Sequence, residues 1–211
     1  MVVAKSVVSV VVPKTLQVQL VLLKQWSWQP NTVERLQGAA ITLFSERGYS
    51  DVTVADIAGH AGLTKRTFFN HFADKREVLF AGSAALEEQV ELYIREAAAG
   101  EPAMDVAISA LARAGQTLST YGEISRLRQD VIASSPELQE RSLIKMASLS
   151  TVIASGLAAR DATLSHARLI ADSAVTVFGA AYSTWADSPA SEFSDHMQTV
   201  LAELRSAIGA R

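Results

Sequence analysis

The spacing of hydrophobic residues takes on a helical period early in the chain. Asn31 and Glu34 form a capping-box pattern, in which each side chain serves a backbone N–H group at the start of a helix. Gly48 follows Arg47, as expected where a helix ends in a left-handed residue. Between these signals, apolar residues recur three or four positions apart, at Val33, Leu36, Ala40, Leu43 and Phe44. We therefore predict a first helix over residues 32–47.

Two short helices are predicted next, joined by a tight turn. Thr53 can cap the first of them, and Asp56 at its third position is favourable for the helix dipole. Thr64 can cap the second, and Gly62 lies in the three-residue turn between them. A turn of that length with glycine is typical of a helix-turn-helix. The residues expected to fix the crossing of the two helices are Ile57, Ala58 and Phe68.

The second short helix presents an unusual set of polar residues. At about 100° per residue, Phe68 and Phe72 fall on one side of this helix. Its other side and its N-terminal end carry Lys65, Arg66, Thr67 and Asn70. Side chains of these types read base edges in a major groove, since Arg or Lys pairs with guanine, Asn with adenine, and a Thr methyl group contacts thymine. The sequence therefore favours a DNA-reading helix, and the alternative is an ordinary helical hairpin inside a bundle.

The rest of the chain predicts helices throughout. Asp74 and Glu77 repeat the capping-box pattern and predict a fourth helix that runs to about Ala99. Glycine, proline or short polar residues interrupt the later pattern near residues 100–102, 121–122, 134–136, 160–161 and 187–189. The expected fold class is all-α. It comprises an N-terminal three-helix helix-turn-helix domain, residues 31–80, and a C-terminal helical domain, residues 81–211, with about six helices counting the fourth.

Charge is divided unevenly between the two predicted domains. The chain of 211 residues has a formal net charge of −3. Residues 1–80 hold nine Lys/Arg and six Asp/Glu, a balance of +3, whereas residues 81–211 hold ten and sixteen, a balance of −6. A mildly basic part joined to an acidic remainder suits a small nucleic-acid reader carried on a domain that does not touch the nucleic acid.

The composition argues against several kinds of chemistry. The chain has no cysteine, which excludes disulfides, thiolate metal ligands and thiol nucleophiles. It also contains no G-x-S-x-G, no glycine-rich phosphate loop and no H-E-x-x-H. We therefore expect no enzyme activity, no catalytic residue, no metal site and no cofactor. An all-α enzyme stays open as an alternative and would need a pocket lined by convergent ionisable groups.

Residues 1–30 do not fit the pattern that follows them. They are rich in Val and Leu, but polar residues interrupt the run and Pro13–Lys14 splits it near the middle. A membrane span needs about 20 mostly apolar residues, and the small-residue cleavage site of a signal peptide does not follow. We interpret the segment as an N-terminal extension. An upstream start codon is favoured over a membrane-associated segment as its origin.

Residues 32–80 resemble the N-terminal domain of TetR-family regulators. The matching run is AAITLFSERGYSDVTVADIAGHAGLTKRTFFNHFADKREVL. It carries the family's Gly-Tyr pair, its Thr-x-x-x-Ile-Ala core, its Ala-Gly-Leu turn and an aromatic stretch followed by Lys75. The resemblance implies a cytoplasmic, homodimeric transcriptional regulator, most often a repressor, that binds a palindromic operator in double-stranded DNA. It also implies a C-terminal domain that dimerises and binds a small-molecule effector.

The resemblance further assigns the residues that would meet DNA. Base or groove contacts fall on Lys65, Arg66, Thr67 and Asn70. The residues that would contact the sugar-phosphate backbone, or pack beside it, are Thr53, Phe69, His71 and Lys75, together with the cap residue Thr64.

The chain also departs from the family pattern. The family usually has Tyr where this chain has Phe69, so a hydroxyl contact to phosphate is lost. Only Lys24 supplies positive charge just before the first helix, where many members carry a basic arm. The alternative function is therefore a helical ligand-binding or interaction protein that has lost operator reading.

Two helices of the C-terminal domain are candidates for a dimer interface. The helix expected over residues 164–185 is rich in Ala, Ser and Gly, which allow close packing against a second copy in a symmetric seam. Its alternative role is the core helix of a monomer. The final helix, over residues 192–208, would complete a four-helix interface. Candidate residues of an effector pocket are Met104, Arg128, Met146, Phe178, Tyr182 and Trp185.

Overall fold

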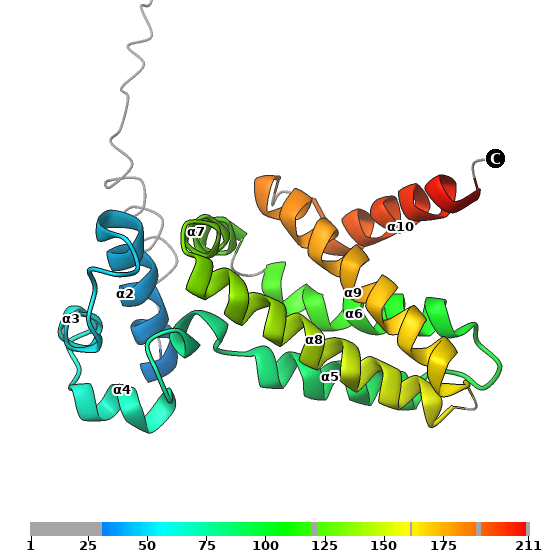
Figure 1. The fold of residues 1–211 in the computed structure, drawn as a ribbon, viewed down its shortest axis with the longest axis horizontal. Helices are drawn as coiled ribbons and strands as arrows, with labels where there is room; N and C mark the ends of the chain where they lie inside the picture. Colours follow the sequence, from blue (N-terminus) through cyan, green and yellow to red (C-terminus); the bar gives the residue numbers. More distant parts are fainter. Residues whose placement is uncertain (1–30, 120–121, 161, 189–190, 210–211) are drawn as a thin grey trace, which may run out of the picture.

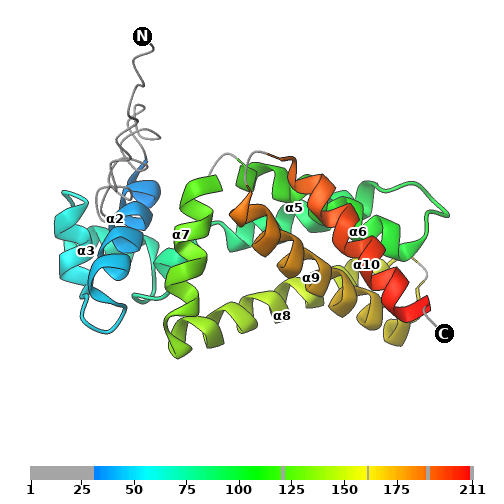
Figure 2. The same ribbon diagram turned by 90° about the horizontal axis from the view of Figure 1, so that it is seen from above.

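The computed structural model describes residues 31–119, 122–160, 162–188 and 191–209, so the predicted N-terminal extension lies outside the described residues. The described residues form helices and no β-strand, which confirms the all-α class. The molecule is elongated (Figures 1 and 2). A three-helix unit lies at one end, and the remaining helices extend away from it. We call residues 31–80 the head and residues 83–209 the body.

The head contains the three predicted helices in the predicted order. They are α2 (Thr32–Arg47), α3 (Val54–His60) and α4 (Lys65–His71). The Asn31–Glu34 capping box forms as predicted, and Gly48 ends α2 at φ 82°. Gly62 has φ 65° in the turn between α3 and α4, a conformation that residues with a Cβ atom rarely adopt. These local signals were therefore sufficient to place the helix boundaries.

The body contains six helices within the described residues, as predicted. They are α5 (Ser83–Glu96), α6 (Ala103–Ser119), α7 (Gly122–Ala133), α8 (Pro136–Ala158), α9 (Leu164–Asp187) and α10 (Phe193–Gly209). The central helix is α9, which packs against α6, α8 and α10. None of the helices described here is long and apolar enough to cross a membrane.

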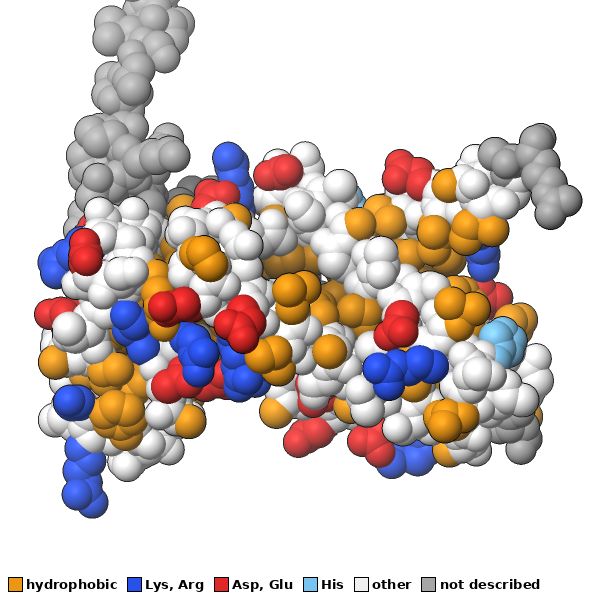
Figure 3. Space-filling model, in the orientation of Figure 1, with side chains coloured by type: hydrophobic (Ala, Val, Ile, Leu, Met, Phe, Trp, Pro, Cys, Tyr) orange, Lys and Arg blue, Asp and Glu red, His pale blue; other side chains and the backbone are white. Residues whose placement is uncertain are grey.

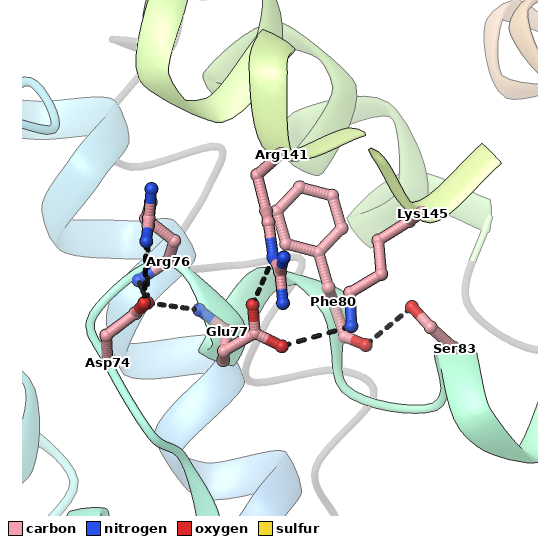
Figure 4. Close-up of polar contacts among 7 residues, drawn as sticks. All are labelled: Asp74, Arg76, Glu77, Phe80, Ser83, Arg141 and Lys145. Atoms are coloured by element: carbon pink, nitrogen blue, oxygen red, sulfur yellow. Dashed lines mark hydrogen bonds and ion pairs between the residues drawn. The ribbon is translucent and has the colours of Figure 1, made fainter. Parts of the chain in front are cut away.

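The fourth helix is not continuous, contrary to the prediction. A short 3-10 helix, η1 (Glu77–Phe80), comes first, and Gly82 at φ 90° separates it from α5. The Ser83 hydroxyl donates to the Phe80 carbonyl across this break (Figure 4). Three consecutive residues of η1, Val78, Leu79 and Phe80, are buried. Successive residues of a 3-10 helix point about 120° apart, so all three are buried because apolar residues of the head core surround η1.

The capping box predicted at Asp74 and Glu77 does not form either. The Glu77 side chain is drawn away to Arg141 and Lys145 on α8 (Figure 4). The Asp74 carboxylate accepts hydrogen bonds from the backbone N–H groups of Arg76 and Glu77, at 2.8 and 3.2 Å. A long-range ion pair has therefore overridden the local pattern.

Two hydrophobic cores run through the molecule. The head core includes Phe44, Ile57 and Phe68, and it is closed by Val131 of α7 and Leu138 of α8. The body core is built around α9, where Trp185 is fully buried. Because α7 and the start of α8 complete the head core, the head is packed directly onto the body.

Candidate DNA-binding surface

Helix α4 is held in place by its cap and by two phenylalanines. The Thr64 hydroxyl accepts a hydrogen bond from the Thr67 N–H group at 3.1 Å, which starts the helix. Phe68 is fully buried and Phe72 is 6% exposed, and their ring centres lie 5.2 Å apart. A helix of seven residues is unstable alone, so this apolar anchor is what keeps α4 formed.

The opposite side of α4 projects from the molecule. It presents five exposed side chains, which we call the α4 face: Lys65, Arg66, Phe69, Asn70 and His71. Phe69 is 49% exposed, and the Lys65 ammonium lies 5.9 Å from the centre of its ring. Figure 3 shows Lys/Arg side chains projecting from this end of the molecule beside a hydrophobic patch. The predicted division of α4 is confirmed for buried Phe68 and Phe72 and for exposed Lys65, Arg66 and Asn70, whereas Thr67 is only partly exposed.

The three threonines assigned to DNA contact are engaged within the head. Thr64 and Thr67 share a hydrogen bond between their hydroxyl groups at 2.8 Å. The Thr53 hydroxyl and backbone N–H both donate to the Asp56 carboxylate, at 2.5 and 2.8 Å. These two bonds hold the pKa of Asp56 below its usual value. Thr53 and Thr64 thus cap α3 and α4, Thr67 bonds to the second cap, and the roles of all three toward DNA stay predictions.

The turn between α3 and α4 is tied to α2 by a residue that sequence reasoning did not single out. The Arg35 guanidinium donates to the Ala61 carbonyl at 2.5 Å, and it lies near the point where a side chain on Gly62 would start. Ile57 and Ala58 are buried at the helix crossing, as predicted. The two partners of the Arg35 contact lie 26 positions apart, so no local spacing rule points to it.

Lys75 points into the head and not outward. Its ammonium donates to the carbonyl oxygens of Tyr49 and Val52, at 2.7 and 2.9 Å. It also lies 4.0 Å from the centre of the Tyr49 ring. Burial lowers the pKa of Lys75. Burial and the nearby carboxylate of Glu137 raise the pKa of Tyr49 to about 12.

A cluster of charged residues joins the head to the body. Glu77 of η1 forms ion pairs with Arg141 and Lys145, the second with an N–O distance of 3.1 Å (Figure 4). Burial alone would raise the pKa of Glu77, but the hydrogen bonds from these two cations bring it below its usual value. Arg128 of α7 donates to the Leu79 carbonyl beside them. The i, i+4 spacing of the two α8 cations is visible in the sequence, but their partner is not.

The six candidate pocket residues do not form one group. Phe178, Tyr182 and Trp185 belong to an aromatic cluster that Phe193 completes, with ring centres 5.6 to 6.5 Å from that of Phe193. Met104 and Met146 are partly buried against the same body core. Arg128 is apart from them, at the contact between head and body. The pocket therefore stays a prediction. Arg128 lies apart from the other five candidates and is the one least suited to line a pocket with them.

The charge balance of the described head is neutral. Residues 31–80 hold six Lys/Arg and six Asp/Glu, because the excess of +3 counted over residues 1–80 comes from Lys5, Lys14 and Lys24. Within the head, Lys75 is turned inward and Arg76 is paired with Asp74 at 2.9 Å. The exposed cations of the described head are therefore Lys65 and Arg66 on the α4 face and Arg47 at the end of α2.

Comparison with known sequences places this head within a described family. The family model described as "Bacterial regulatory proteins, tetR family" matches residues 38–81. A Mycobacterium tuberculosis protein is 30% identical over 133 residues, covering 61% of this chain and 65% of that protein. It is described as a mycofactocin biosynthesis transcriptional regulator, MftR. The Tn10 TetC protein of Escherichia coli is 39% identical over 67 residues, covering 30% of this chain and 32% of that protein. This chain thus spans less than two thirds of the length of each relative.

The body and the overall fold have relatives too. A structure from Syntrophomonas wolfei, described as a TetR-family transcriptional regulator, matches with a TM-score of 0.57 and 18% identity, covering 85% of this chain and 96% of that one. At that identity the likeness concerns the fold. A second family model, the MftR C-terminal domain, matches residues 101–209, more than half of the chain. With one model on the head and another on the body, the chain belongs to the TetR family of bacterial regulatory proteins and has a C-terminal domain of the MftR type.

Proposed function

We propose that this chain is a sequence-specific DNA-binding transcriptional regulator. The observation that carries the proposal is the α4 face, where Lys65, Arg66 and Asn70 project from a helix anchored behind by buried phenylalanines. A major groove admits one α-helix, and cationic and amide side chains at its exposed surface can pair with guanine and adenine edges. A structural helix that only packed against the body would not need these side chains in solvent.

The proposal includes a homodimer, because reading a palindromic operator requires two heads. Helices α9 and α10 are the proposed interface. The inner side of α9 is buried in the body core, while its outer side carries Gly179 and Ala180, both exposed. A Cβ atom on Gly179 would meet nothing within 4 Å. Leu164 and Leu169 on the same helix are 72% and 66% exposed, and a partner would cover such apolar surface.

A small-molecule effector is proposed to bind in the body and to release the operator, so that the chain acts as a repressor in the cytoplasm. An effector shifts the head only to the extent that it prefers one of two conformations. The contact between head and body provides a path by which a conformational change in the body reaches the head. Glu77, just after the head's last α-helix, is held by two residues of α8, and α8 also packs along α9 in the body core.

The first experiment is to select duplexes from a random-sequence pool with the full chain. Affinity for a selected duplex and for a scrambled one is then measured across a salt series. A regulator should prefer the selected duplex by at least about a thousandfold, and its affinity should fall steeply with salt. A chain that has lost operator reading would enrich no sequence, and that result would favour a helical ligand-binding or interaction protein.

A further inference from the structure

The four histidines of the chain differ in their surroundings. His196 on α10 has partners for both ring nitrogens, the Thr184 hydroxyl at 3.1 Å and the Ser191 hydroxyl at 2.7 Å. His71 is exposed on the α4 face. Among the described residues its ring lies beside that of Phe72, with 6.4 Å between ring centres, and has no hydrogen bond or ion pair. Both nitrogens of His71 are therefore available to a partner outside the chain.

The charged residues that follow His71 in the sequence are engaged with other groups. Asp74 forms an ion pair with Arg76 at 2.9 Å. Lys75 donates to two carbonyls of the turn before α3. A positive charge on the His71 ring would therefore meet no paired carboxylate from this segment.

Helix α3, which packs against α4, carries two titratable groups, Asp56 and His60. The Asp56 carboxylate accepts hydrogen bonds from the hydroxyl and the backbone N–H of Thr53. His60 is exposed at the end of α3. Neither group pairs with His71, so a proton taken up by His71 adds its full charge to the α4 face.

One added charge is a large change for this face. Residues 31–80 hold equal numbers of Lys/Arg and Asp/Glu, and the cations of the α4 face are Lys65 and Arg66. Histidine is the side chain that ordinarily changes its charge between about pH 5 and 8. Because DNA phosphates attract cations, DNA binding and protonation of His71 should each favour the other.

We propose that His71 makes DNA binding depend on pH. Its imidazole takes up a proton when the α4 face meets the phosphates, so the chain binds its operator more tightly as pH falls from about 8 to 5.5. The inference rests on the proposed DNA-binding function and adds to it a regulation of the same surface. The proton comes from solvent and is released when the protein leaves the duplex or the pH rises.

The test compares the wild-type chain with His71→Gln, which stays neutral, and with His71→Lys, which stays charged. His60→Gln is the matched control, because His60 is exposed in the head but lies outside the α4 face. Affinities for a duplex selected by the wild-type chain and for a scrambled duplex are measured at pH of about 5.5 and 8, each across a salt series. Circular dichroism at both pH values checks folding, and His71→Asn replaces the glutamine variant if the latter is unfolded.

Each phosphate contact that is gained steepens the plot of log affinity against log salt by about 0.9. We expect the wild-type slope to be steeper at the lower pH by about that amount for each head, with an affinity about tenfold higher at the same salt concentration. His60→Gln should behave like the wild type. His71→Gln should keep the shallow slope at both pH values, and His71→Lys the steep one.

A wild-type slope that does not change with pH, or a His71→Gln slope that steepens as much as that of the wild type, would overturn the proposal. If the wild-type chain selects no sequence, the proposed function fails. The same slopes measured on the scrambled duplex then judge the role of His71, because phosphate contacts do not depend on sequence. A chain that binds neither duplex would reject both.

Discussion

Thr53 illustrates how single side chains set the geometry of the head. Its hydroxyl and its backbone N–H both donate to the Asp56 carboxylate, and its hydroxyl also accepts from the Asp56 N–H group at 3.2 Å. This capping box fixes the first turn of α3, which has only seven residues. Without it, the exposed N–H groups of the first turn would have to bind water.

We expect Thr53→Ala to lower the free energy of unfolding by about 1 kcal/mol, the usual cost of losing an N-cap. The measurement is urea denaturation, read as a lower midpoint at an unchanged slope. Thr151→Ala is the matched control, because Thr151 is exposed on α8 and its hydroxyl donates to the Ala147 carbonyl within the same helix. An equal loss of unfolding free energy in both variants would show that the N-cap of α3 contributes no specific stability.

At the residue scale, the sequence predicts what is local. The caps at Asn31, Thr53 and Thr64 and the turns at Gly48 and Gly62 follow from residues within three or four positions of each other. The inward position of Lys75 could not be predicted, because its acceptors are backbone carbonyls more than twenty positions away. A sequence shows which groups can cap a helix but not which distant carbonyl a lysine will reach.

At the scale of elements, the first turns of α8 form the contact between head and body. Glu137, Arg141 and Lys145 are spaced four residues apart and so lie on one side of the helix. The negative charge of Glu137 favours the neutral form of Tyr49 and the charged form of Lys75. Arg141 and Lys145 form ion pairs with Glu77. Opposite charges therefore face each other along this side of α8, and a shift of α8 would move the head.

Glu77→Gln should destabilise the chain in a pH-dependent way. The pKa of Glu77 lies below its usual 4.5 in the folded chain, so the carboxylate stabilises fully above that pH. The contribution is lost as pH falls through the lower, folded value. We expect a cost of about 1–2 kcal/mol at pH 7, as for a hydrogen bond to a charged group, shrinking below pH 4.5. Unfolding free energies of both chains across pH test this, and a difference constant with pH would contradict it.

The C-terminus of α5 depends on one arginine from the end of α8. The Arg160 guanidinium donates to the carbonyls of Ile94, Ala97 and Ala98, at 3.1, 2.8 and 2.5 Å. The last carbonyls of a helix have no N–H donor within that helix and need another partner. A single side chain from a distant helix thus replaces the glycine cap that α5 lacks.

Arg160→Met should therefore lower the free energy of unfolding by about 1–2 kcal/mol. Arg168→Met serves as the control, because Arg168 pairs with Asp172 in the same helix and both side chains are more than half exposed. Such surface pairs contribute little. Chemical denaturation of the two variants measures the difference. Similar midpoints for both would mean that the cap is dispensable.

The fourth helix shows where prediction fails at this scale. The pattern of Asp74 and Glu77 predicts a capping box, but the Glu77 carboxylate pairs with Arg141 and Lys145 instead. The spacing of apolar residues predicts the helices of the body, because that spacing reflects which side of each helix is buried. The interruption at Gly82 accompanies the packing of η1 against α2 and its polar contacts with α7 and α8, which a local pattern does not contain.

At the scale of the whole molecule, α9 is a core helix on one side and exposed on the other. The sequence left the choice between a monomer core and a dimer seam open because small residues suit both. The buried side contains Ala167, Ala171 and Ala174, and the exposed side contains Gly179 and Ala180. The first set explains the packing of the body, and the second is available to a partner.

Ala180→Arg should convert the proposed dimer into a monomer, because a charged side chain would enter the interface without a counter-charge. Ala84→Arg is the control, since Ala84 is exposed on α5, which packs against α6 and α8. Light scattering coupled to size exclusion gives the mass of each variant. A monomeric wild-type chain, or a dimeric Ala180→Arg variant, would rule out this interface.

The central claim is that the α4 face reads bases, and Arg66 is the side chain best suited to guanine. The most direct measurement is the affinity of wild type, Arg66→Ala and Arg95→Ala for a selected duplex and for a panel with each base pair replaced in turn. Arg95 is exposed on α5 near the end remote from the head. We predict that only Arg66→Ala loses its discrimination at one position of each half-site, worth about 1–3 kcal/mol. Unchanged affinity and base preferences in Arg66→Ala would contradict the account.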